Sequence, residues 1–317
     1  MPLLEVRDLR TYYFTYRGVV KAVDGISFEV EKGKTLGLAG ESGCGKSTAA
    51  YSIIKLVPPP GRIVGGQIIF DGMDLTKMSE SEIRRKIRWK RISMVFQGAM
   101  NALTPVYTIA KQITEVLTYH AGMSKTEALQ RAAELLEMVG LDRTVLRRYP
   151  HELSGGMKQR AFIAMALALN PDLVIADEPT TALDVVVQAQ ILNLLKRLQK
   201  ELGIGLILIT HDLAVTAEMS DYVAVMYAGK IVEYGPNELI FREPLHPYSE
   251  GLIMSVPSLR RPRKVKWIPG LPPDLIEPPK GCRFHPRCSR AMDICREKEP
   301  PMVEVKGRKV ACWLYAR

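Results

Sequence analysis

The chain has 317 residues, 47% of them hydrophobic, which is enough apolar sequence for one large domain or two. It has no run of about 18 apolar residues, and its first residues lack a basic segment followed by an apolar one. We therefore expect neither a membrane span nor a secretion signal, and we expect a protein of the cytosol.

The first predicted elements lead into a glycine-rich loop. Residues 3–9 and 22–30 have the character of strands. Residues 35–39 are apolar and predict a buried strand, and residues 49–54 predict a helix. The segment between them fits the phosphate-loop pattern of Gly, four residues and Gly-Lys-Ser/Thr. It reads Gly40-Glu41-Ser42-Gly43-Cys44-Gly45-Lys46-Ser47-Thr48.

A strand, a glycine loop and a helix start are the context that this motif needs. Its glycines let successive backbone N–H groups point at a phosphate, and the helix N-terminus adds partial positive charge. We expect the whole loop to bind nucleotide, with Lys46 reaching the outer phosphates and Ser47 holding Mg²⁺. The alternative is a chance glycine turn before a helix.

The middle of the chain predicts a helical insert. Residues 92–96 form an apolar strand that ends at Gln97, and the pattern then becomes helical, with Ser124 as an N-cap. Together with a helix that starts after His151-Glu152-Leu153-Ser154-Gly155-Gly156, this gives an insert at about 98–168. The flanking strands and helices alternate, so we expect an α/β fold with a mostly parallel core sheet.

Polar residues end three of the predicted buried strands. Asp177 and Glu178 follow an apolar strand, as Gln97 and His211 follow two others. Ligands bind at the carboxyl edge of open α/β sheets. We expect Asp177 to reach Mg²⁺ through its ligand shell and Gln97 to contact Mg²⁺ or water. We expect Glu178 to polarise the attacking water and His211 to contact the terminal phosphate. The alternative is ordinary solvated strand ends.

The order of these motifs resembles the nucleotide-binding subunit of an ATP-binding cassette transporter over roughly residues 3–240. The resemblance implies that Ser154, Gly155 and Gly156 are the family signature, which closes over ATP held by another subunit. The family usually has Gln where this chain has Met157. Asp184 corresponds to the inter-subunit loop. The resemblance also implies an antiparallel β subdomain and an aromatic that stacks on adenine; Tyr13 is our choice and Tyr16 the alternative.

The tail resembles one branch of that family. His246-Pro247-Tyr248 and residues 255–259 are similar to the C-terminal extension of dipeptide and oligopeptide importer ATPases. Relatives with this extension also import nickel or oligosaccharides. We divide the chain into a cassette at 1–245 and a loop-rich, proline-rich extension at 246–317.

Four of the five cysteines lie in the extension, and in a cytosolic protein such a group indicates metal before disulfide. Their spacings do not match those of paired zinc ligands. Four thiolates on an irregular loop suit a 4Fe–4S cluster, which some dipeptide importer ATPases carry. Zinc, free thiols and a disulfide are the alternatives. The residues are Cys282, Cys288, Cys295 and Cys312.

The formal net charge is +10, and residues 257–317 hold 15 Lys/Arg against 6 Asp/Glu. A basic tail could bind nucleic acid, anionic lipid or an acidic partner, although a solvated surface is the simpler interpretation. A soluble cassette ATPase that acts on nucleic acid is the second class of function, but we expect no nucleic-acid partner.

The resemblance predicts an ATPase that drives peptide import from the cytoplasmic face of the membrane. Its expected partners are two permease subunits, a second ATPase subunit and, indirectly, an extracytoplasmic peptide-binding protein. We favour a related chain as the second ATPase, giving a heterodimer, and an identical copy is the alternative.

Overall fold

The computed structural model describes residues 1–98, 102–255 and 267–316. Part of the expected extension motif, at 256–259, lies outside the described residues, as do residues 99–101 of the expected insert. The chain forms two compact units, and each is described by itself. Unit 1 comprises residues 1–31, 35–77 and 208–317, and unit 2 comprises residues 32–34 and 78–207.

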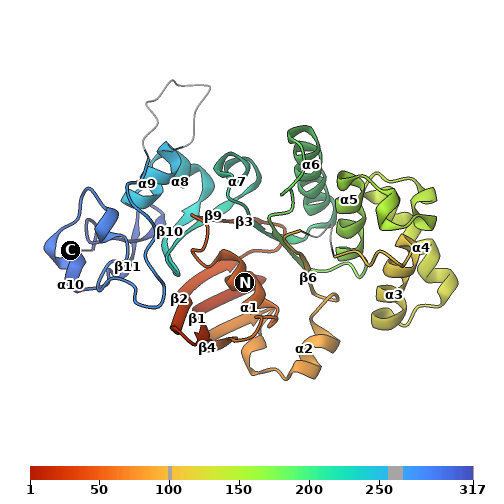
Figure 1. The fold of residues 1–317 in the computed structure, drawn as a ribbon, viewed down its shortest axis with the longest axis horizontal. Coiled ribbons are helices and arrows are strands. Elements are labelled where there is room, and N and C mark those ends of the chain that lie inside the picture. The colour runs from red at the N-terminus through yellow and green to blue at the C-terminus, as the bar shows by residue number, and fades with distance from the viewer. Residues whose placement is uncertain (99–101, 256–266, 317) are drawn as a thin grey trace. The chain divides into compact units, whose positions relative to one another are not determined.

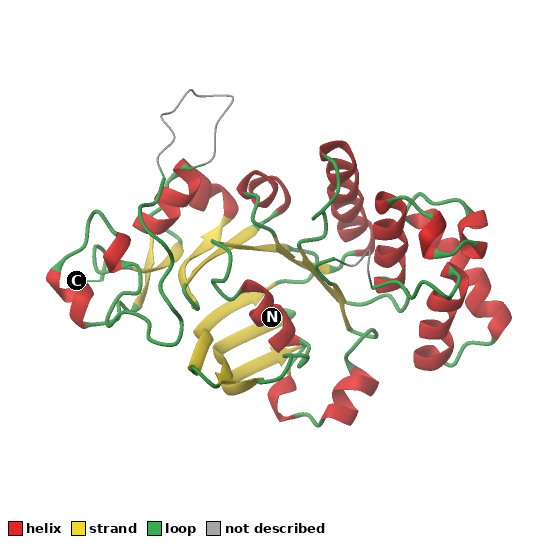
Figure 2. Cartoon of the chain, viewed as in Figure 1, coloured by secondary structure: helices red, strands yellow, loops and turns green. Residues whose placement is uncertain are grey.

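Unit 1 contains an antiparallel sheet of four strands in the order β2-β1-β4-β5, yellow in Figure 2. Buried and exposed residues alternate along much of its first strand, which is typical of a sheet with one covered face. This sheet is the expected antiparallel β subdomain. Its strands are β1 Leu4–Thr15, β2 Gly18–Val30, β4 Gly61–Phe70 and β5 Met73–Asp74.

Unit 1 also holds strands of a larger, mixed sheet (Figure 1). β3 Thr35–Ala39 is wholly buried and pairs in parallel with β9 Tyr222–Tyr227, which forms an antiparallel hairpin with β10 Lys230–Pro236. The extension then adds β12 Arg308–Ala311 beside β10 and β11 Met302–Val305 beside β12. These two strands were not predicted, because the sequence indicated an extension made of loops.

The helices of unit 1 are short. One of them, α1, starts directly at the phosphate loop. In the described part of the extension there are two α-helices and one 3-10 segment, and the rest is mainly loops. The helices, including two single-turn 3-10 segments, are α1 Lys46–Ile53, η1 Leu75–Lys77, α7 Leu213–Met219, α8 Asn237–Arg242, α9 Pro247–Met254, η5 His285–Arg287 and α10 Asp293–Glu297.

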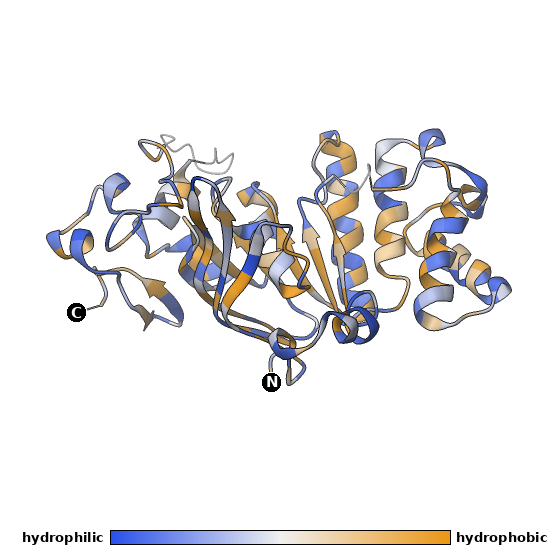
Figure 3. Ribbon diagram, turned by 60° about the horizontal axis from the view of Figure 1, so that its bottom comes forward, coloured by the Kyte–Doolittle hydropathy of each residue, from blue (hydrophilic) through white to orange (hydrophobic). Residues whose placement is uncertain are grey.

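Unit 2 combines buried strands with helices that are apolar on one face (Figure 3). β6 Ile92–Val95 and β7 Leu173–Asp177 pair in parallel, and every residue of both is buried. β8 Gly205–Ile209 contains the boundary between the two units. The helices are α2 Glu80–Lys86, α3 Ile109–Ala121, α4 Lys125–Met138, η3 Arg143–Arg147, η4 Pro150–Glu152, α5 Gly155–Ala166 and α6 Val185–Leu202.

The helical insert follows the capping residues in the sequence. Ser124 caps α4 and forms a capping box with Glu127, as the pattern predicted. Thr108 caps α3, which ends at Gly122 in the left-handed conformation (φ 68°) that favours glycine. The helical pattern with an N-cap at Ser124 is therefore confirmed as two helices, α3 and α4. Among the described residues, no helix is both long enough and apolar enough to cross a bilayer.

Candidate functional site

The glycines of the phosphate loop are required by close approach of the backbone. A Cβ on Gly40 would lie 2.2 Å from the carbonyl oxygen of Met226, and one on Gly45 would lie 2.1 Å from that of Ala22. Both glycines also have positive φ, 149° and 107°. The buried strand β3 ends just before this loop and α1 begins just after it, which is the predicted strand–loop–helix context.

Lys46 lies folded over the loop. Its Nζ donates to the carbonyl oxygens of Gly40 at 2.7 Å and Glu41 at 2.9 Å, and it lies 3.6 Å from Cys44 Sγ. An ammonium with three donors can exchange such a contact for a phosphate oxygen without leaving the loop. The backbone of Cys44 is tied down as well, because its carbonyl accepts the N–H of Gly229 at 2.9 Å.

The two candidate aromatics lie in different surroundings. The Tyr13 hydroxyl lies 3.4 Å from the Oγ1 of Thr48, the last residue of the loop, and its ring covers Gly61. Tyr16 is 93% exposed and contacts the guanidinium of Arg17. His211, also in unit 1, is exposed and comes just before Asp212, the N-cap of α7.

Unit 2 brings Gln97 and Glu178 together. β6 and β7 pair in parallel with Val95 opposite Ala176, so their carboxyl ends meet at one edge. There Gln97 Nε2 donates to Glu178 Oε2 at 2.9 Å. Asp177 next to it is completely buried at the end of β7. The prediction that polar strand ends gather at one edge is therefore confirmed for this pair.

The sequence missed Thr181. Its hydroxyl donates to the same oxygen, Glu178 Oε2, at 2.9 Å. The threonine is three residues after the acid in a turn, where the Thr181 N–H also donates to the carbonyl of Glu178 at 3.2 Å. A Thr three positions after an acid is the local signal that could have identified it.

The signature residues form a helix start. Ser154 caps α5 by accepting the N–H of Met157 at 3.3 Å. A Cβ on Gly156 would lie 2.7 Å from a methyl group of Val187 in α6, so glycine permits the close packing of α5 and α6. Asp184 caps α6, because its carboxylate accepts the N–H groups of Val186 and Val187. In this structure Asp184 therefore fixes the start of α6.

The prediction of a 4Fe–4S cluster in the extension is wrong. Within the described part of the chain, no group of three or more His, Cys, Asp or Glu side chains could hold a metal ion, which also removes the zinc alternative. All five cysteines are free. Burial raises the pKa of Cys282 to about 11 and also raises those of Cys288 and Cys312, which disfavours the thiolate form that binds metal.

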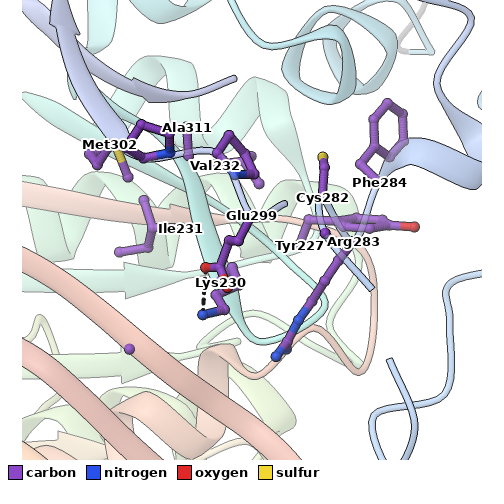
Figure 4. A pocket seen from close by; sticks show the side chains of 14 residues that line it. Tyr227, Lys230, Ile231, Val232, Cys282, Arg283, Phe284, Glu299, Met302 and Ala311 are labelled. Atoms are coloured by element: carbon purple, nitrogen blue, oxygen red, sulfur yellow. Dashed lines mark ion pairs between the residues drawn. The ribbon is translucent and has the colours of Figure 1, made fainter. Parts of the chain in front are cut away.

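A cavity of about 350 Å³ adjoins the extension in unit 1 (Figure 4). It is lined by residues of β9 and β10 and by extension residues, among them Cys282 and Arg283. Its charged groups are paired: Lys230 contacts Glu299 of the lining at 2.7 Å, and both Lys230 and Arg283 contact Asp24, which is not part of the lining. The phosphate loop does not line it, so we do not assign nucleotide to this cavity.

The loop of unit 1 and the acidic strand end of unit 2 define a P-loop nucleotide-binding protein. The family model described as "ABC transporter" matches residues 23–181, and a model described as "Oligopeptide/dipeptide transporter, C-terminal region" matches residues 232–295. The chain belongs to the ABC transporter family and is an ATPase of that family. This confirms the resemblance drawn from the motifs.

Curated relatives match along almost the whole chain. Oligopeptide transport ATP-binding protein OppD of Bacillus subtilis is 52% identical, covering 98% of this chain and 88% of the relative. Dipeptide transport ATP-binding protein DppD of Caldanaerobacter subterraneus is 47% identical, covering 99% and 97%.

Solved structures confirm the fold. A dimeric bacterial ABC transporter cassette is 29% identical, covers 74% of this chain and 98% of its own, and has a TM-score of 0.66. A post-hydrolysis state of that cassette bound to ADP and phosphate gives a TM-score of 0.65. The predicted α/β cassette fold is therefore confirmed, and its larger sheet contains both parallel and antiparallel pairs. The domain boundary at residue 245 stays a prediction.

Proposed function

We propose that this chain is the ATP-hydrolysing subunit of an importer for dipeptides or oligopeptides. The observation that carries the proposal is the C-terminal region at 232–295, which matches the model described for oligopeptide and dipeptide transporters. Relatives that share nearly the full length are named as oligopeptide or dipeptide transport ATP-binding proteins. Cargo selection then belongs to partner proteins, and this chain supplies the energy.

In the proposed mechanism the phosphate loop, residues 40–48, binds the phosphates of ATP. The loop fits phosphate because Gly40 and Gly45 allow a close backbone packing in which a Cβ would clash with neighbouring carbonyls, and Lys46 supplies the cation. Ser47, Gln97 and Asp177 are the proposed ligands of Mg²⁺, which neutralises developing charge on the phosphates when bound. Tyr13 stacks on adenine, with Tyr16 as the alternative.

Glu178 is the proposed general base for the attacking water. The hydrogen bonds from Gln97 and Thr181 converge on one carboxylate oxygen, Oε2, and hold the orientation of the carboxylate. The carboxylate held in this way is the proposed acceptor of the proton from water. His211 is proposed to donate a hydrogen bond to the terminal phosphate as charge builds there.

The proposed partners follow from the proposed function. Ser154, Gly155 and Gly156 would contact ATP held by a second ATPase subunit, because they form the start of α5 and helix N-termini favour anions. Two permease subunits, with a peptide-binding protein delivering cargo, complete the importer, and this chain acts on their cytoplasmic face. We favour a related chain over an identical copy as the second ATPase.

Transport by the reconstituted complex tests this function. The chain is assembled in vesicles with its permeases, binding protein and second ATPase, and uptake of a labelled tripeptide is measured with and without ATP. We expect ATP-dependent uptake that Glu178→Gln abolishes while ATP binding persists. Uptake of nickel or an oligosaccharide in place of peptide would overturn the cargo, and failure to hydrolyse ATP would overturn the whole proposal.

A further inference from the structure

Glu41, the second residue of the phosphate loop, is held by the C-terminal extension. Arg287 Nη1 donates to Glu41 Oε2 at 2.7 Å, and Arg287 Nη2 donates to Oε1 at 2.9 Å. The backbone N–H of Glu41 donates to the Tyr248 hydroxyl at 2.9 Å. The carbonyl of Glu41 accepts Lys46 Nζ. Every kind of polar group in Glu41 is thus engaged, two of them by residues of the extension.

The guanidinium of Arg287 has a single, well-fixed orientation. Its side chain is only 6% exposed, and Nε donates to the carbonyl of Pro269 at 2.8 Å. Nη1 also reaches the Tyr227 hydroxyl at 3.4 Å. The hydrogen bonds to Glu41 raise the pKa of Arg287, which stays charged. A planar fork held along both edges restricts where the Glu41 carboxylate can lie.

Tyr248 is equally fixed, by a cluster of aromatic rings. It is fully buried, and its ring centroid lies 4.6 Å from that of Tyr227 and 5.3 Å from that of Phe284. Tyr227 is the last residue of β9 and Phe284 belongs to the extension (Figure 4). The Tyr248 hydroxyl therefore reaches the loop from a rigid base.

Just before α9, the extension is anchored to β10, a strand of the larger, mixed sheet. The buried Glu233 of β10 accepts the backbone N–H groups of Leu245 at 2.9 Å and His246 at 3.0 Å. The buried Arg308 of β12 lies 3.8 Å from the same carboxylate. A displacement of the whole extension would therefore break several buried contacts in addition to those with Glu41.

We propose that Arg287 and Tyr248 are positioning residues for ATP binding, through which the extension sets the conformation of the phosphate loop. The inference rests on the proposed function, because it takes residues 40–48 as the phosphate site. Gly40 and Gly43 flank Glu41, and glycines change conformation easily. A restraint at Glu41 limits that freedom before ATP arrives, and such preorganisation raises affinity.

The test separates nucleotide affinity from folding. Three full-length variants are compared with wild type: Arg287→Met, Arg287→Lys and Tyr248→Phe. The measurements are the Kd of a fluorescent nucleotide, the KM and kcat of ATP hydrolysis in the assembled complex, and the Tm without nucleotide. We expect Arg287→Met to raise Kd and KM about tenfold, from the loss of charged hydrogen bonds, with kcat nearly unchanged. Arg287→Lys should restore part of the affinity, and Tyr248→Phe should raise Kd about threefold.

Two other residues of the extension provide matched controls. Arg290 pairs with Glu250, and the Tyr315 hydroxyl donates to the carbonyl of Leu245, so neither pair includes a loop residue. Arg290→Met and Tyr315→Phe should leave Kd and KM at wild-type values.

Wild-type Kd and KM in all three loop-contact variants, with only a lower Tm, would overturn the inference. If Arg287→Met does not fold, Arg287→Lys and Tyr248→Phe decide. A wild-type protein that neither binds nor hydrolyses ATP would instead overturn the proposed function.

Discussion

At the scale of single residues, Glu178 combines an unusual backbone with a constrained side chain. Its φ of 46° is in the left-handed region, which costs a residue other than glycine about 1 kcal/mol or more. Two hydrogen bonds then hold its carboxylate at one oxygen. Such strain is found at functional sites, where the surrounding structure fixes an orientation that a relaxed chain would not select.

Removal of the Thr181 hydroxyl should slow hydrolysis without weakening ATP binding. Thr181→Val deletes one hydrogen bond to a charged group, and we expect a fall of about tenfold in kcat with KM unchanged. The rate of phosphate release at saturating ATP measures kcat, and its dependence on ATP concentration measures KM. Thr114→Val is the control, because that hydroxyl bonds only to carbonyls of its own helix. An unchanged kcat would remove Thr181 from the site.

At the scale of elements, the start of α9 depends on a buried neutral histidine. His246 is 1% exposed, and its Nδ1 accepts the N–H of Tyr248 at 3.0 Å as the helix cap. Burial lowers the pKa of His246 to about 3. A protonated ring could not accept this hydrogen bond, so the cap requires the neutral form.

Stability should therefore fall in mild acid. Below pH 6.5 the unfolded chain binds a proton at His246 while the folded chain does not, so this contribution is complete above pH 6.5 and is lost toward pH 3. The slope is about 1.4 kcal/mol per pH unit. We expect wild type to lose about 1.4 kcal/mol more than His246→Asn between pH 7.5 and 5.5 in urea unfolding.

His151→Asn is the control for this comparison, because His151 is exposed. Its stability should follow that of wild type at both pH values. Equal losses in wild type and His246→Asn would show that the cap does not titrate in this range. The buried Glu233 is present in all three proteins, so its own titration cancels.

The elements that the sequence predicted well are those whose signals are local. The phosphate loop is defined by nine consecutive residues between a buried strand and a helix. Ser124 marks the start of α4, where it forms a capping box. Gln97 and Glu178 could be paired from sequence because the ends of parallel strands meet. The pattern at 109–139 did not show where α3 ends, because hydrophobic periodicity does not register the left-handed residue Gly122.

The extension was harder because its contacts are distant in sequence. Arg287 and Tyr248 lie 246 and 207 positions from Glu41, and no periodic pattern links them. The four cysteines were misinterpreted for a related reason. Their grouping in the extension, their spacing and the family resemblance indicated a metal centre, whereas their arrangement in space and their burial oppose one.

At the scale of the whole molecule, the proposed function requires association. The proposed mechanism assigns phosphate binding to residues 40–48 and the signature contact to Ser154 of another subunit. Nucleotide should therefore hold two ATPase subunits together for as long as it stays uncleaved. A similar solved cassette is dimeric, which agrees with this expectation.

A slow variant should make this association visible. Mixed with its partner subunit and Mg-ATP, Glu178→Gln should sediment as a stable dimer, whereas wild type should dissociate as ATP is consumed. Lys46→Met, which loses the loop cation, should stay monomeric and serves as control. A Glu178→Gln protein that remains monomeric with its partner at saturating ATP would contradict the shared-nucleotide model.

The ion pair between Glu41 and Arg287 has a consequence for biosynthesis. A ribosome makes Glu41 246 positions earlier than Arg287, so for most of translation the loop exists without its restraint. Chains begin to fold from the N-terminal side while synthesis continues. A nascent cassette would therefore hold ATP poorly until its last segment emerged, and unfinished copies would compete weakly for places in the assembled transporter.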